Sequence, residues 1–399
     1  MTSGPAQEWS SDPTSVLVNL TWLVPGVVGG SERATTDALR AVLECGPNDV
    51  DLRLAVLRPF LAAHPDLAAA LPCEVLDLDG SAKLRRVVAE QTWLAMVARR
   101  TGAQVVHHAG GVVPILHPGR VVVTIHDLQP LDLPSNFSVA KRIYIRTMVG
   151  RSARTADVVC VPSGFTRSRV LDLLAVSPSR VRVVPWSVPP HDLDPDPATV
   201  PDKSEVHAGA SADGPYFLYP AITYPHKNHR VLIEAFARVA ATSPDVHLVL
   251  TGGEGPVEHE VTDRVRALGL GARVRRTGRV SSVELDRWYE HAAAVVVPSR
   301  YEGFGLPALE AMARGCPVIA SRAGSLPEFV RAEDLVDPDD VTAWANAMQA
   351  VLSMDGSERS ARIAAGLARA LEFTPERTAS ALLDSYRQAA GAPVDTPAP

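Results

Sequence analysis

The sequence of 399 residues has only four cysteines, and none stands at a spacing typical of a disulfide framework or a metal site (Cys45, Cys73, Cys160 and Cys316). Such unpaired cysteines indicate reduced thiols in a cytoplasmic protein. Excess positive charge is also absent, because the formal net charge is −6, which argues against a nucleic-acid-binding surface. No run approaches the roughly twenty apolar residues of a membrane span. We therefore expect a soluble protein, with peripheral contact at the inner face of a membrane left open.

The chain is too long for a typical single domain, and two α/β domains are the natural expectation. Polar residues with Gly and Pro at 1–15, and a short tail at 392–399, predict disordered ends. A stretch rich in Pro, Asp and small residues predicts an interdomain linker at 191–214. The remaining boundaries are 16–190 for an N-terminal domain, 215–372 for a C-terminal domain and 373–391 for a final helix.

The most informative stretch is PSRYEGFGLPALEAMARGCP at residues 298–317. It lies between two apolar, β-branched runs that predict buried parallel strands, residues 292–297 and 318–321. Pro307 suits the first turn of a helix, and Gly315 suits its C-terminal end. The stretch therefore predicts a strand, a glycine-bearing loop and a helix N-terminus.

This unit predicts a ligand site. The free N–H groups of the first helical turn suit a phosphate, and Gly303 and Gly305 let a ligand approach the backbone closely. Glu302 in the loop and Glu310 about one turn inside the helix can point into the same crevice. Because two acids would repel a bare phosphate, the pattern favours a ligand with phosphate at one point and hydroxyl groups on either side. A nucleotide sugar has this chemistry; the alternative is an ordinary α/β turn with two solvated glutamates.

Residues 302–310, EGFGLPALE, resemble the E-x7-E signature of retaining glycosyltransferases of family 4, which have the GT-B fold. The resemblance extends through residues 315–318 and 324–328 and is more specific than a lone glycine motif. It implies an α/β protein of two Rossmann-like domains, each a doubly wound parallel sheet, that face a cleft. The N-terminal domain would bind the acceptor and the C-terminal domain the nucleotide sugar. A final helix would cross back to the N-terminal domain.

The resemblance also implies roles for individual residues. Glu302 would hold hydroxyl groups of the donor sugar and Glu310 those of the ribose. The leaving diphosphate would meet the backbone N–H groups of Phe304, Gly305 and Leu306.

Lys227 lies in a PHKN segment, residues 225–228, that is similar to the family segment whose lysine meets the donor diphosphate. The arginine that the family places shortly before this lysine is replaced by Ala221. Either Arg279 supplies the second positive charge, or fewer cations hold the phosphate.

Strand and helix patterns alternate through the first half, beginning with a strand predicted at residues 16–24. Gly29 and Gly30 precede a helix expected at 31–44 and form a phosphate-type turn. In the resembled family the matching turn faces the donor diphosphate or the acceptor. We assign these glycines, together with Gly252 beyond a later strand, to donor binding, although many α/β loops carry such glycines.

Residues just beyond the ends of parallel strands line the ligand crevice of a doubly wound sheet. A strand at 121–125 leads into His126 and Asp127, which could orient a sugar hydroxyl or a phosphate oxygen. The alternative is a histidine capped by its neighbour. The resembled family has a histidine here near the reacting sugar, which favours His126 over residues 107–108. Asp127 and Ser163, another residue that the family places near the cleft, are assigned to the acceptor side.

Five basic residues fall on one predicted helix: Lys141, Arg142, Arg146, Arg151 and Arg154. We interpret them as a solvated face. The alternative is contact with anionic lipid, which would suit a lipid-linked acceptor.

Three Asp-x-Asp triplets resemble the metal-binding motif of another glycosyltransferase class, at residues 77–79, 192–194 and 194–196. Two lie in the predicted linker, where no scaffold fixes ligand geometry, and the other lacks a nearby nucleotide loop. We therefore predict no metal and no cofactor apart from the substrate.

The second half repeats the strand–helix alternation and predicts a parallel sheet covered by helices on both faces. The expected strands are 216–219, 246–250 and 273–277, and the expected helices are 228–241, 257–268, 282–292 and 374–389. The last of these helices carries Ala379, Leu382, Leu383 and Tyr386 on one face.

Together the residues and the resemblance predict a retaining, metal-independent hexosyltransferase. Residues 124–127 and 224–228 are similar to bacterial mannosyltransferases of polysaccharide assembly, so GDP-mannose is the first-choice donor, with UDP- and dTDP-hexoses left open. The acceptor would be a glycan or a lipid-linked glycan. Two alternatives remain: a catalytically silent protein that binds nucleotide sugars, and a GT-B epimerase that acts on the nucleotide sugar with water.

Overall fold

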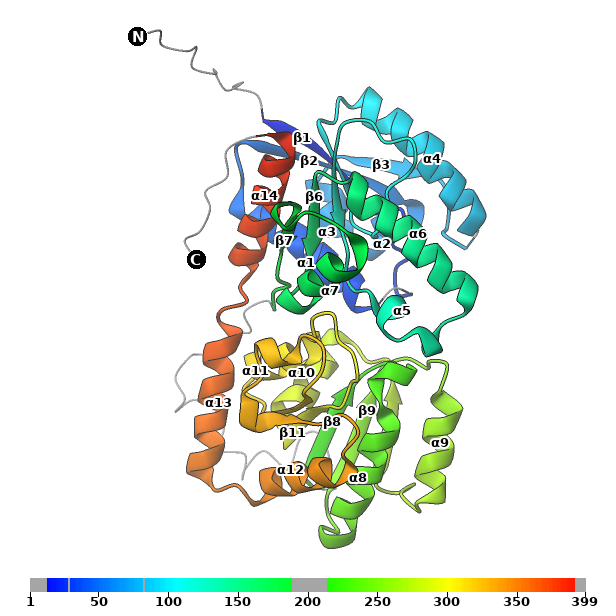
Figure 1. The fold of residues 1–399 in the computed structure, drawn as a ribbon. Coiled ribbons are helices and arrows are strands. Elements are labelled where there is room, and N and C mark those ends of the chain that lie inside the picture. Colours follow the sequence, from blue (N-terminus) through cyan, green and yellow to red (C-terminus); the bar gives the residue numbers. More distant parts are fainter. Residues whose placement is uncertain (1–12, 28, 82, 189–213, 392–399) are drawn as a thin grey trace.

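The computed structural model describes residues 13–27, 29–81, 83–188 and 214–391, which form two α/β domains stacked one above the other (Figure 1). The predicted linker lies outside the described residues, apart from its last residue. The predicted disordered ends also fall outside them, apart from residues 13–15. Thr14 and Ser15 already belong to the first strand.

The N-terminal domain contains a seven-stranded sheet with the order β3-β2-β1-β4-β5-β6-β7. Every neighbouring pair is parallel. The strands are β1 Thr14–Asn19, β2 Val50–Leu57, β3 Cys73–Leu76, β4 Val105–His108, β5 Arg120–Thr124, β6 Val158–Val161 and β7 Val181–Val183.

The C-terminal domain contains a six-stranded parallel sheet with the order β10-β9-β8-β11-β12-β13. In both sheets the strand order reverses beside the first strand of the domain, between β1 and β4 and between β8 and β11. Ligands of doubly wound sheets bind outside the carboxyl ends of the strands at such switch points. The strands are β8 Tyr216–Pro220, β9 His247–Thr251, β10 Val274–Gly278, β11 Ala294–Val297, β12 Val318–Ser321 and β13 Leu335–Val336.

Helices flank both sheets (Figure 1). In the N-terminal domain they are α1 Gly30–Cys45, α2 Arg58–Ala63, α3 Pro65–Ala70, α4 Lys83–Arg100, α5 Gln129–Asp132, α6 Val139–Thr155 and α7 Gly164–Leu174. In the C-terminal domain they are α8 His229–Thr242, α9 Glu258–Ala267, α10 Ser282–His291, α11 Leu306–Ala313, α12 Val341–Ser353 and α13 Gly356–Ala370, and the chain ends in α14 Pro375–Ala390. The two-domain GT-B architecture expected from the sequence is confirmed.

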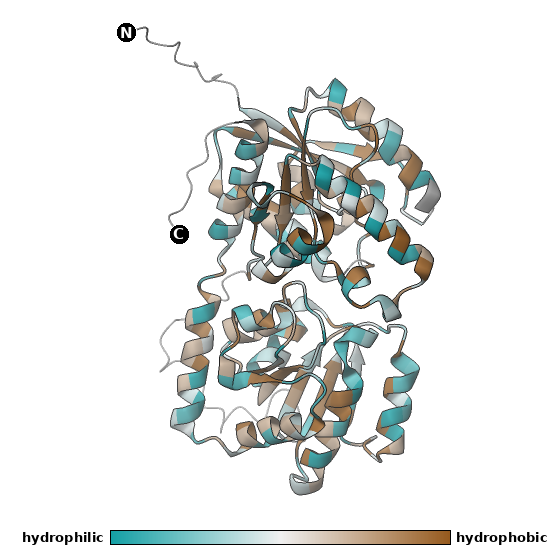
Figure 2. Ribbon diagram, viewed as in Figure 1, coloured by the Kyte–Doolittle hydropathy of each residue, from teal (hydrophilic) through white to brown (hydrophobic). Residues whose placement is uncertain are grey.

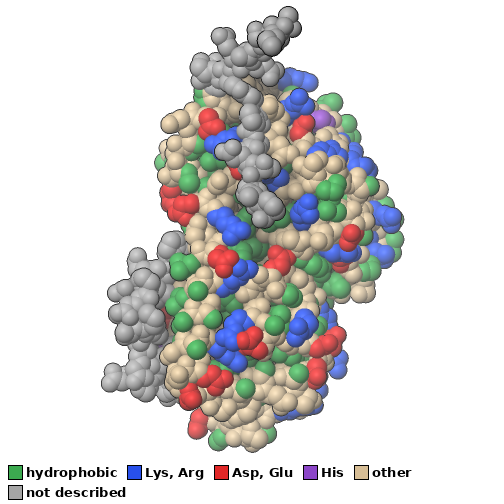
Figure 3. Space-filling view, turned by 60° about the vertical axis from the view of Figure 1, so that its left-hand side comes forward, with side chains coloured by type: hydrophobic (Ala, Val, Ile, Leu, Met, Phe, Trp, Pro, Cys, Tyr) green, Lys and Arg blue, Asp and Glu red, His purple; other side chains and the backbone are tan. Residues whose placement is uncertain are grey.

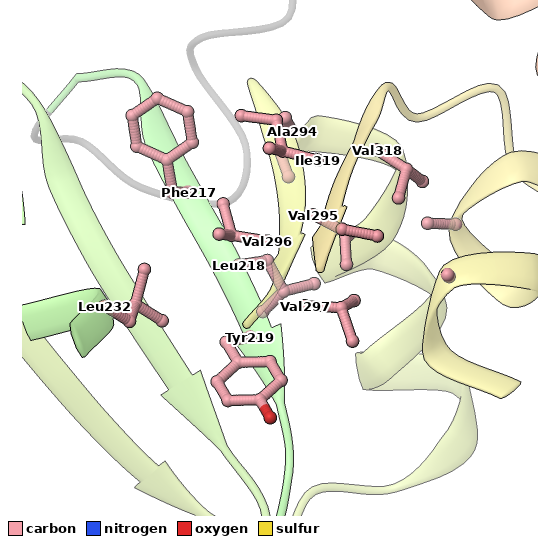
Figure 4. Close-up of a cluster of buried hydrophobic side chains, with 14 of the residues drawn as sticks. Phe217, Leu218, Tyr219, Leu232, Ala294, Val295, Val296, Val297, Val318 and Ile319 are labelled. Atoms are coloured by element: carbon pink, nitrogen blue, oxygen red, sulfur yellow. The ribbon is translucent and has the colours of Figure 1, made fainter. Parts of the chain in front are cut away.

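The sheets are the cores of the domains, as the brown strands in Figure 2 show. All four residues of β11 are buried, as are residues 216–219 of the neighbouring β8 and all of β12. Their side chains pack with Leu232 of α8 in the cluster drawn in Figure 4. Strands buried on both faces need continuous apolar runs, which is why the pattern of residues 292–297 was informative.

The crossing helix α14 runs from the C-terminal domain onto the N-terminal sheet, as expected (red in Figure 1). The expected face, Ala379, Leu382, Leu383 and Tyr386, is buried in the N-terminal core. The Tyr386 hydroxyl also lies 2.9 Å from Nδ1 of His107 on β4.

The first strand is shorter than the sequence predicted. It ends at Asn19 instead of continuing through the apolar residues up to Val24. The side-chain oxygen of Asn19 accepts hydrogen bonds from the backbone N–H of Thr21, at 3.1 Å, and from its hydroxyl, at 2.7 Å. Asparagine competes with the strand ladder in this way, so the chain turns while its side chains stay buried.

Within the described residues, no helix has the length and apolar character required to cross a membrane. On the face turned forward in Figure 3, basic and acidic side chains are interspersed.

Candidate active site

Loops from both domains enclose a cleft of about 510 Å³. They follow the carboxyl ends of β1, β5, β8, β9, β10 and β11, at and near the two switch points. All the site residues predicted from the sequence line this cleft except Ser163: Gly29, Gly30, His126, Asp127, Lys227, Gly252, Arg279, Glu302, Gly303, Phe304, Gly305, Leu306 and Glu310.

The Glu302 loop is held by the turn at residues 324–325, the second part of the family resemblance. The N–H and hydroxyl of Ser325 both donate to the Glu302 carbonyl at 3.1 Å, and the hydroxyl also reaches the Phe304 carbonyl at 2.6 Å. A Cβ on Gly324, where φ is +61°, would stand 2.5 Å from the Glu302 carbonyl oxygen. Only glycine allows this approach, so the turn fixes the backbone from which the Glu302 carboxylate projects.

Gly303 lies where the two domains touch. A Cβ there would stand 2.5 Å from the backbone oxygen of His126 in the opposite domain. Its carbonyl accepts hydrogen bonds from the hydroxyls of Ser163, at 2.6 Å, and Thr166, at 3.1 Å. The group that approaches this glycine closely is therefore the backbone of the N-terminal domain. Ser163, which was assigned to the acceptor side, is buried behind the loop and does not line the cleft.

Helix α11 begins directly after this loop. Gly305 caps it with φ of +97°, and a Cβ there would stand 2.8 Å from Leu326. Pro307 lies in the first turn, where a missing N–H costs nothing. The N–H groups of the first turn have no acceptors within the helix, so this end of α11 favours an anion.

Lys227 ends a short 3-10 turn, Pro225–Lys227, after β8. The next residue, Asn228, has φ of +57°, a conformation that asparagine tolerates better than most residues. Its amide donates to two carbonyls of the C-terminal domain, and the Tyr219 hydroxyl donates to the Lys227 carbonyl at 2.8 Å. These bonds fix the backbone, so the lysine side chain projects into the cleft.

The Lys227 ammonium lies 2.7 Å from Oε1 of Glu302. Burial alone would raise the pKa of Glu302, but the charge of Lys227 and hydrogen bonds from Lys227 and Ser299 outweigh it and hold the pKa below its ordinary value. Glu302 and Glu310 are only 8% and 5% exposed, which excludes the alternative of two solvated glutamates. The Lys227–Glu302 ion pair places one positive and one negative group at the start of α11.

Both oxygens of Glu310 are engaged. The buried Tyr289 hydroxyl donates to Oε2 at 2.6 Å. Arg33, on α1 of the other domain, donates to Oε1 at 2.6 Å. The sequence analysis missed both partners. Arg33 lies 277 positions from Glu310 in the sequence, and no local pattern joins them.

Arg279 also crosses the cleft, where its guanidinium donates to the carbonyl of Gly26 at 2.6 Å. Gly253 lies beside it, since a Cβ there would stand 2.9 Å from Nε of Arg279. Gly252 packs against the backbone of Ala221, the position where the resembled family has an arginine. Arg279 is thus in the cleft, near the position that lacks the family's cation.

The His126 ring lies between Trp22 and Trp186, with ring centroids 5.5 and 5.7 Å away. Its Nε2–H donates to the Ala109 carbonyl at 2.9 Å, and its buried Nδ1 has no hydrogen-bond partner in the described part of the chain. Burial lowers the pKa of His126 to about 4. The ring is therefore neutral at pH 7 and offers an unused acceptor.

Asp127 does not cap His126, because its carboxylate accepts from the Gln129 N–H at 3.0 Å. Burial and the charge of Glu302 raise the pKa of Asp127, and the charges of Lys227 and Lys141 offset part of this rise. His107 bridges the Tyr386 and Thr124 hydroxyls, which makes it part of the packing under α14. Both ring nitrogens of His107 are therefore engaged within the fold.

Among the described residues, no group of three or more His, Cys, Asp or Glu side chains could hold a metal ion. Asp77 pairs with Arg58, and Asp79 accepts from Ser81. The two other Asp-x-Asp triplets lie outside the described residues. Within the described residues, none of the four cysteines forms a disulfide bond.

Two family models match the sequence. "Glycosyltransferase Family 4" matches residues 28–192, and "Glycosyl transferases group 1" matches residues 202–367. O-antigen chain mannosyltransferase B of Escherichia coli is 30% identical over 271 residues, 67% of this chain and 70% of that protein. A D-inositol 3-phosphate glycosyltransferase of Nocardioides sp. is 31% identical over 385 residues, 90% of this chain and 80% of that protein.

Solved structures share the fold. Sucrose-phosphate synthase from Thermosynechococcus elongatus has a TM-score of 0.73 at 21% identity, covering 94% of this chain and 98% of that one. Anabaena HepE in complex with UDP and glucose has a TM-score of 0.70 at 19% identity, covering 93% and 98%. With these relatives and its two facing parallel sheets, the chain belongs to the GT-B glycosyltransferases of family 4.

Proposed function

We propose that this glycosyltransferase moves a hexose from a nucleoside diphosphate donor to a glycan or lipid-linked glycan, with retention of anomeric configuration and without a metal ion. The observation that carries the proposal is the Lys227–Glu302 pair at the N-terminus of α11, with Glu310 one turn further on. The lysine and the helix N-terminus suit the diphosphate of a nucleotide sugar. The two carboxylates suit the hydroxyl groups of its sugar and its ribose.

In this reaction the leaving diphosphate gains negative charge while the sugar becomes an oxocarbenium-like cation. Lys227, Arg279 and the N–H groups of residues 304–306 stabilise the departing charge. Glu302 holds hydroxyls of the donor sugar, and Glu310 binds the ribose. Lys227 balances the buried Glu302 until the diphosphate arrives, so this carboxylate is not left unpaired in the empty site.

His126 acts as a neutral hydrogen-bond acceptor beside the reacting sugar. Its unpartnered Nδ1 suits a sugar hydroxyl, and its low pKa keeps the ring uncharged. The leaving phosphate takes the acceptor proton on the same face of the sugar, so no separate enzymic base is needed. Asp127 lies on the acceptor side.

GDP-mannose is the first-choice donor. Two relatives bear mannosyltransferase names: the Escherichia coli protein above, and the MMP alpha-(1->4)-mannosyltransferase of Mycolicibacterium hassiacum, which is 35% identical over 201 residues. The HepE complexes contain UDP, so UDP-hexoses remain the second choice. The reaction fits assembly of cell-surface polysaccharide or glycoconjugate in the cytoplasm, where cysteines without disulfide bonds are the rule.

The first half of α6 suits contact with a membrane-borne acceptor. Val139, Ile143 and Tyr144 are 64%, 59% and 47% exposed, and Lys141 and Arg142 stand among them. Apolar side chains interleaved with basic ones favour the surface of an anionic bilayer. The charge of Lys141 offsets part of the rise that burial causes in the pKa of Asp127. This end of α6 is therefore near the part of the cleft that Asp127 lines.

The test is transfer of radiolabelled sugar from GDP-mannose or UDP-glucose to glycan and lipid fractions, with the new linkage analysed by NMR. An α-linked product from these α-linked donors supports retention, and a β-linked product contradicts it. Donor binding without transfer to any fraction favours the silent-protein alternative. Conversion of the donor to a free, epimerised sugar without acceptor favours the epimerase.

A further inference from the structure

The ion pair between Arg33 and Glu310 occupies the carboxylate that the proposed function assigns to the ribose. Arg33 Nη1 lies 2.6 Å from Oε1, and the Tyr289 hydroxyl lies 2.6 Å from Oε2. Glu310 is only 5% exposed with these two groups against it, so a ribose that donates hydrogen bonds to the carboxylate has to take the place of one of them.

The two partners of Glu310 differ in their freedom to leave. Tyr289 is fully buried in the same domain as Glu310. The Arg33 side chain is 38% exposed and comes from the opposite wall of the cleft. A buried hydroxyl cannot move without opening the core, whereas a long exposed side chain can change rotamer. The ribose therefore displaces Arg33 and leaves Tyr289 in place to orient Glu310.

A displaced Arg33 remains beside the place expected for the diphosphate. It lies in the first turn of α1, three residues after Gly30, and a Cβ on Gly30 would stand 3.9 Å from Leu306 at the start of α11. Glu310 follows Leu306 by four residues, which is about 6 Å along the helix axis. A change of side-chain rotamer is therefore enough to carry the guanidinium from Glu310 towards the anion-binding end of α11.

Apart from Glu310, one carboxylate close by holds the Arg33 guanidinium. Within the described residues its only other carboxylate inside 4.0 Å is Asp37, at 3.6 Å. The C-terminal domain has Ala221 where the resembled family has a cation. A guanidinium matches phosphate oxygens with two parallel hydrogen bonds, so it is well suited to supply the missing charge.

We propose that Arg33 is a donor-binding residue that pairs with Glu310 in the empty enzyme and with the donor diphosphate in the loaded enzyme. This inference rests on the proposed function. The exchange replaces a direct contact between the domains with a contact made through the donor, so the same side chain joins the two walls of the cleft in both states.

The test measures dissociation constants of wild type and Arg33→Ala for GDP and UDP by calorimetry, and for guanosine and uridine by NMR titration. For the diphosphate that wild type binds, the alanine variant is expected to bind on the order of tenfold to a hundredfold more weakly. The matching nucleoside should bind equally well or more tightly, because its competitor for Glu310 is gone. Arg33→Lys, which keeps the charge but not the planar fork, should fall between the two proteins.

The matched control is Arg58→Ala, in the same domain, where Arg58 pairs with Asp77 and does not line the cleft. It should bind all probes as wild type does. Unchanged diphosphate binding by Arg33→Ala, or equal weakening of diphosphate and nucleoside, would overturn the inference while leaving the proposed function intact. Failure of the wild type to bind either diphosphate would overturn the proposed function and this inference with it.

Discussion

Lys227 and Glu302 lie 75 positions apart in the sequence, yet Nζ of the lysine is 2.7 Å from Oε1 of the glutamate. The lysine follows β8 and the glutamate follows β11, two strands that are neighbours at the switch point of the C-terminal sheet. The topology therefore brings a cation and an anion to the end of the helix that favours phosphate.

Removing the Glu302 charge is expected to lower the rate of transfer. Glu302→Gln keeps the size of the side chain but replaces a charged acceptor for the donor-sugar hydroxyls with a neutral amide, and kcat should fall on the order of a hundredfold or more. Lys227→Ala should raise KM for the donor and also lower kcat, because it removes a diphosphate ligand and leaves the buried Glu302 unpaired. Steady-state kinetics with the donor measures both effects.

A double-mutant cycle shows whether the two residues act together. If they do, Lys227→Ala/Glu302→Gln should lose much less activity than the product of the single losses. Arg230→Ala is the control, since Arg230 lies three residues beyond Lys227, is exposed on α8 and pairs with Glu234. Independent, multiplicative losses would contradict the shared role.

Stability is expected to fall as the pH drops from about 6.5 towards 4. Burial lowers the pKa of five histidines, to about 3 for His107, His108 and His229 and to about 4 for His126 and His226. Below pH 6.5 these histidines bind protons in the unfolded chain but not in the folded protein. Each of them therefore lowers the free energy of unfolding by up to about 1.4 kcal/mol per pH unit. Urea unfolding across this pH range measures the slope.

A variant separates this effect from general acid denaturation. Replacing His108 by Gln removes one titrating group. The slope of unfolding free energy against pH should then decrease by the contribution of one proton, about 1.4 kcal/mol per pH unit. A stability that does not change between pH 6.5 and pH 5 would show that these histidines are not held neutral in the fold.

Chelation of metal ions is expected to leave activity unchanged. The proposed catalysis relies on Lys227, Arg279 and the start of α11 in place of a divalent cation. Transfer rates with EDTA and with added Mg²⁺ or Mn²⁺ should agree within error. Loss of activity in EDTA that is restored by one metal would place a cation in the mechanism.

Much of this fold could be predicted because the buried strands are continuous apolar runs. The strand–loop–helix at residues 294–313 and the α14 face with Tyr386 followed directly from periodicity and glycine positions. The end of β1 could not be predicted, since Asn19 turns the chain within an apolar run. Apolar content shows that a segment is buried, but not whether its backbone stays extended.

The residues of the cleft were predicted where a loop follows a strand, as at Lys227, Glu302 and His126. Contacts between domains were not predicted. Arg33 reaches Glu310 from the other domain, and Ser163 holds the carbonyl of Gly303. Such pairs depend on how two independently folded surfaces meet, and no periodicity or spacing within one segment encodes that geometry.

Membrane contact through α6 is expected to depend on both charge and apolar area. Vesicles that contain about 30% anionic lipid should bind the wild type, and added salt should weaken binding because it screens Lys141 and Arg142. Ile143→Glu should abolish binding by burying a charge at the interface. Arg266→Glu, on exposed α9, is the control and should bind like wild type. Equal binding to neutral and anionic vesicles would contradict the proposal.

The central claim is that the cleft binds a nucleotide sugar through Lys227, and the most direct measurement is the melting temperature with GDP-, UDP-, dTDP- and ADP-sugars. At about a hundred times its dissociation constant a ligand adds roughly 2.7 kcal/mol, which raises the midpoint by a few degrees. The account predicts such a shift with donors of one base, without metal, and its loss in Lys227→Ala. No shift with any donor, or an equal shift in the variant, would contradict it.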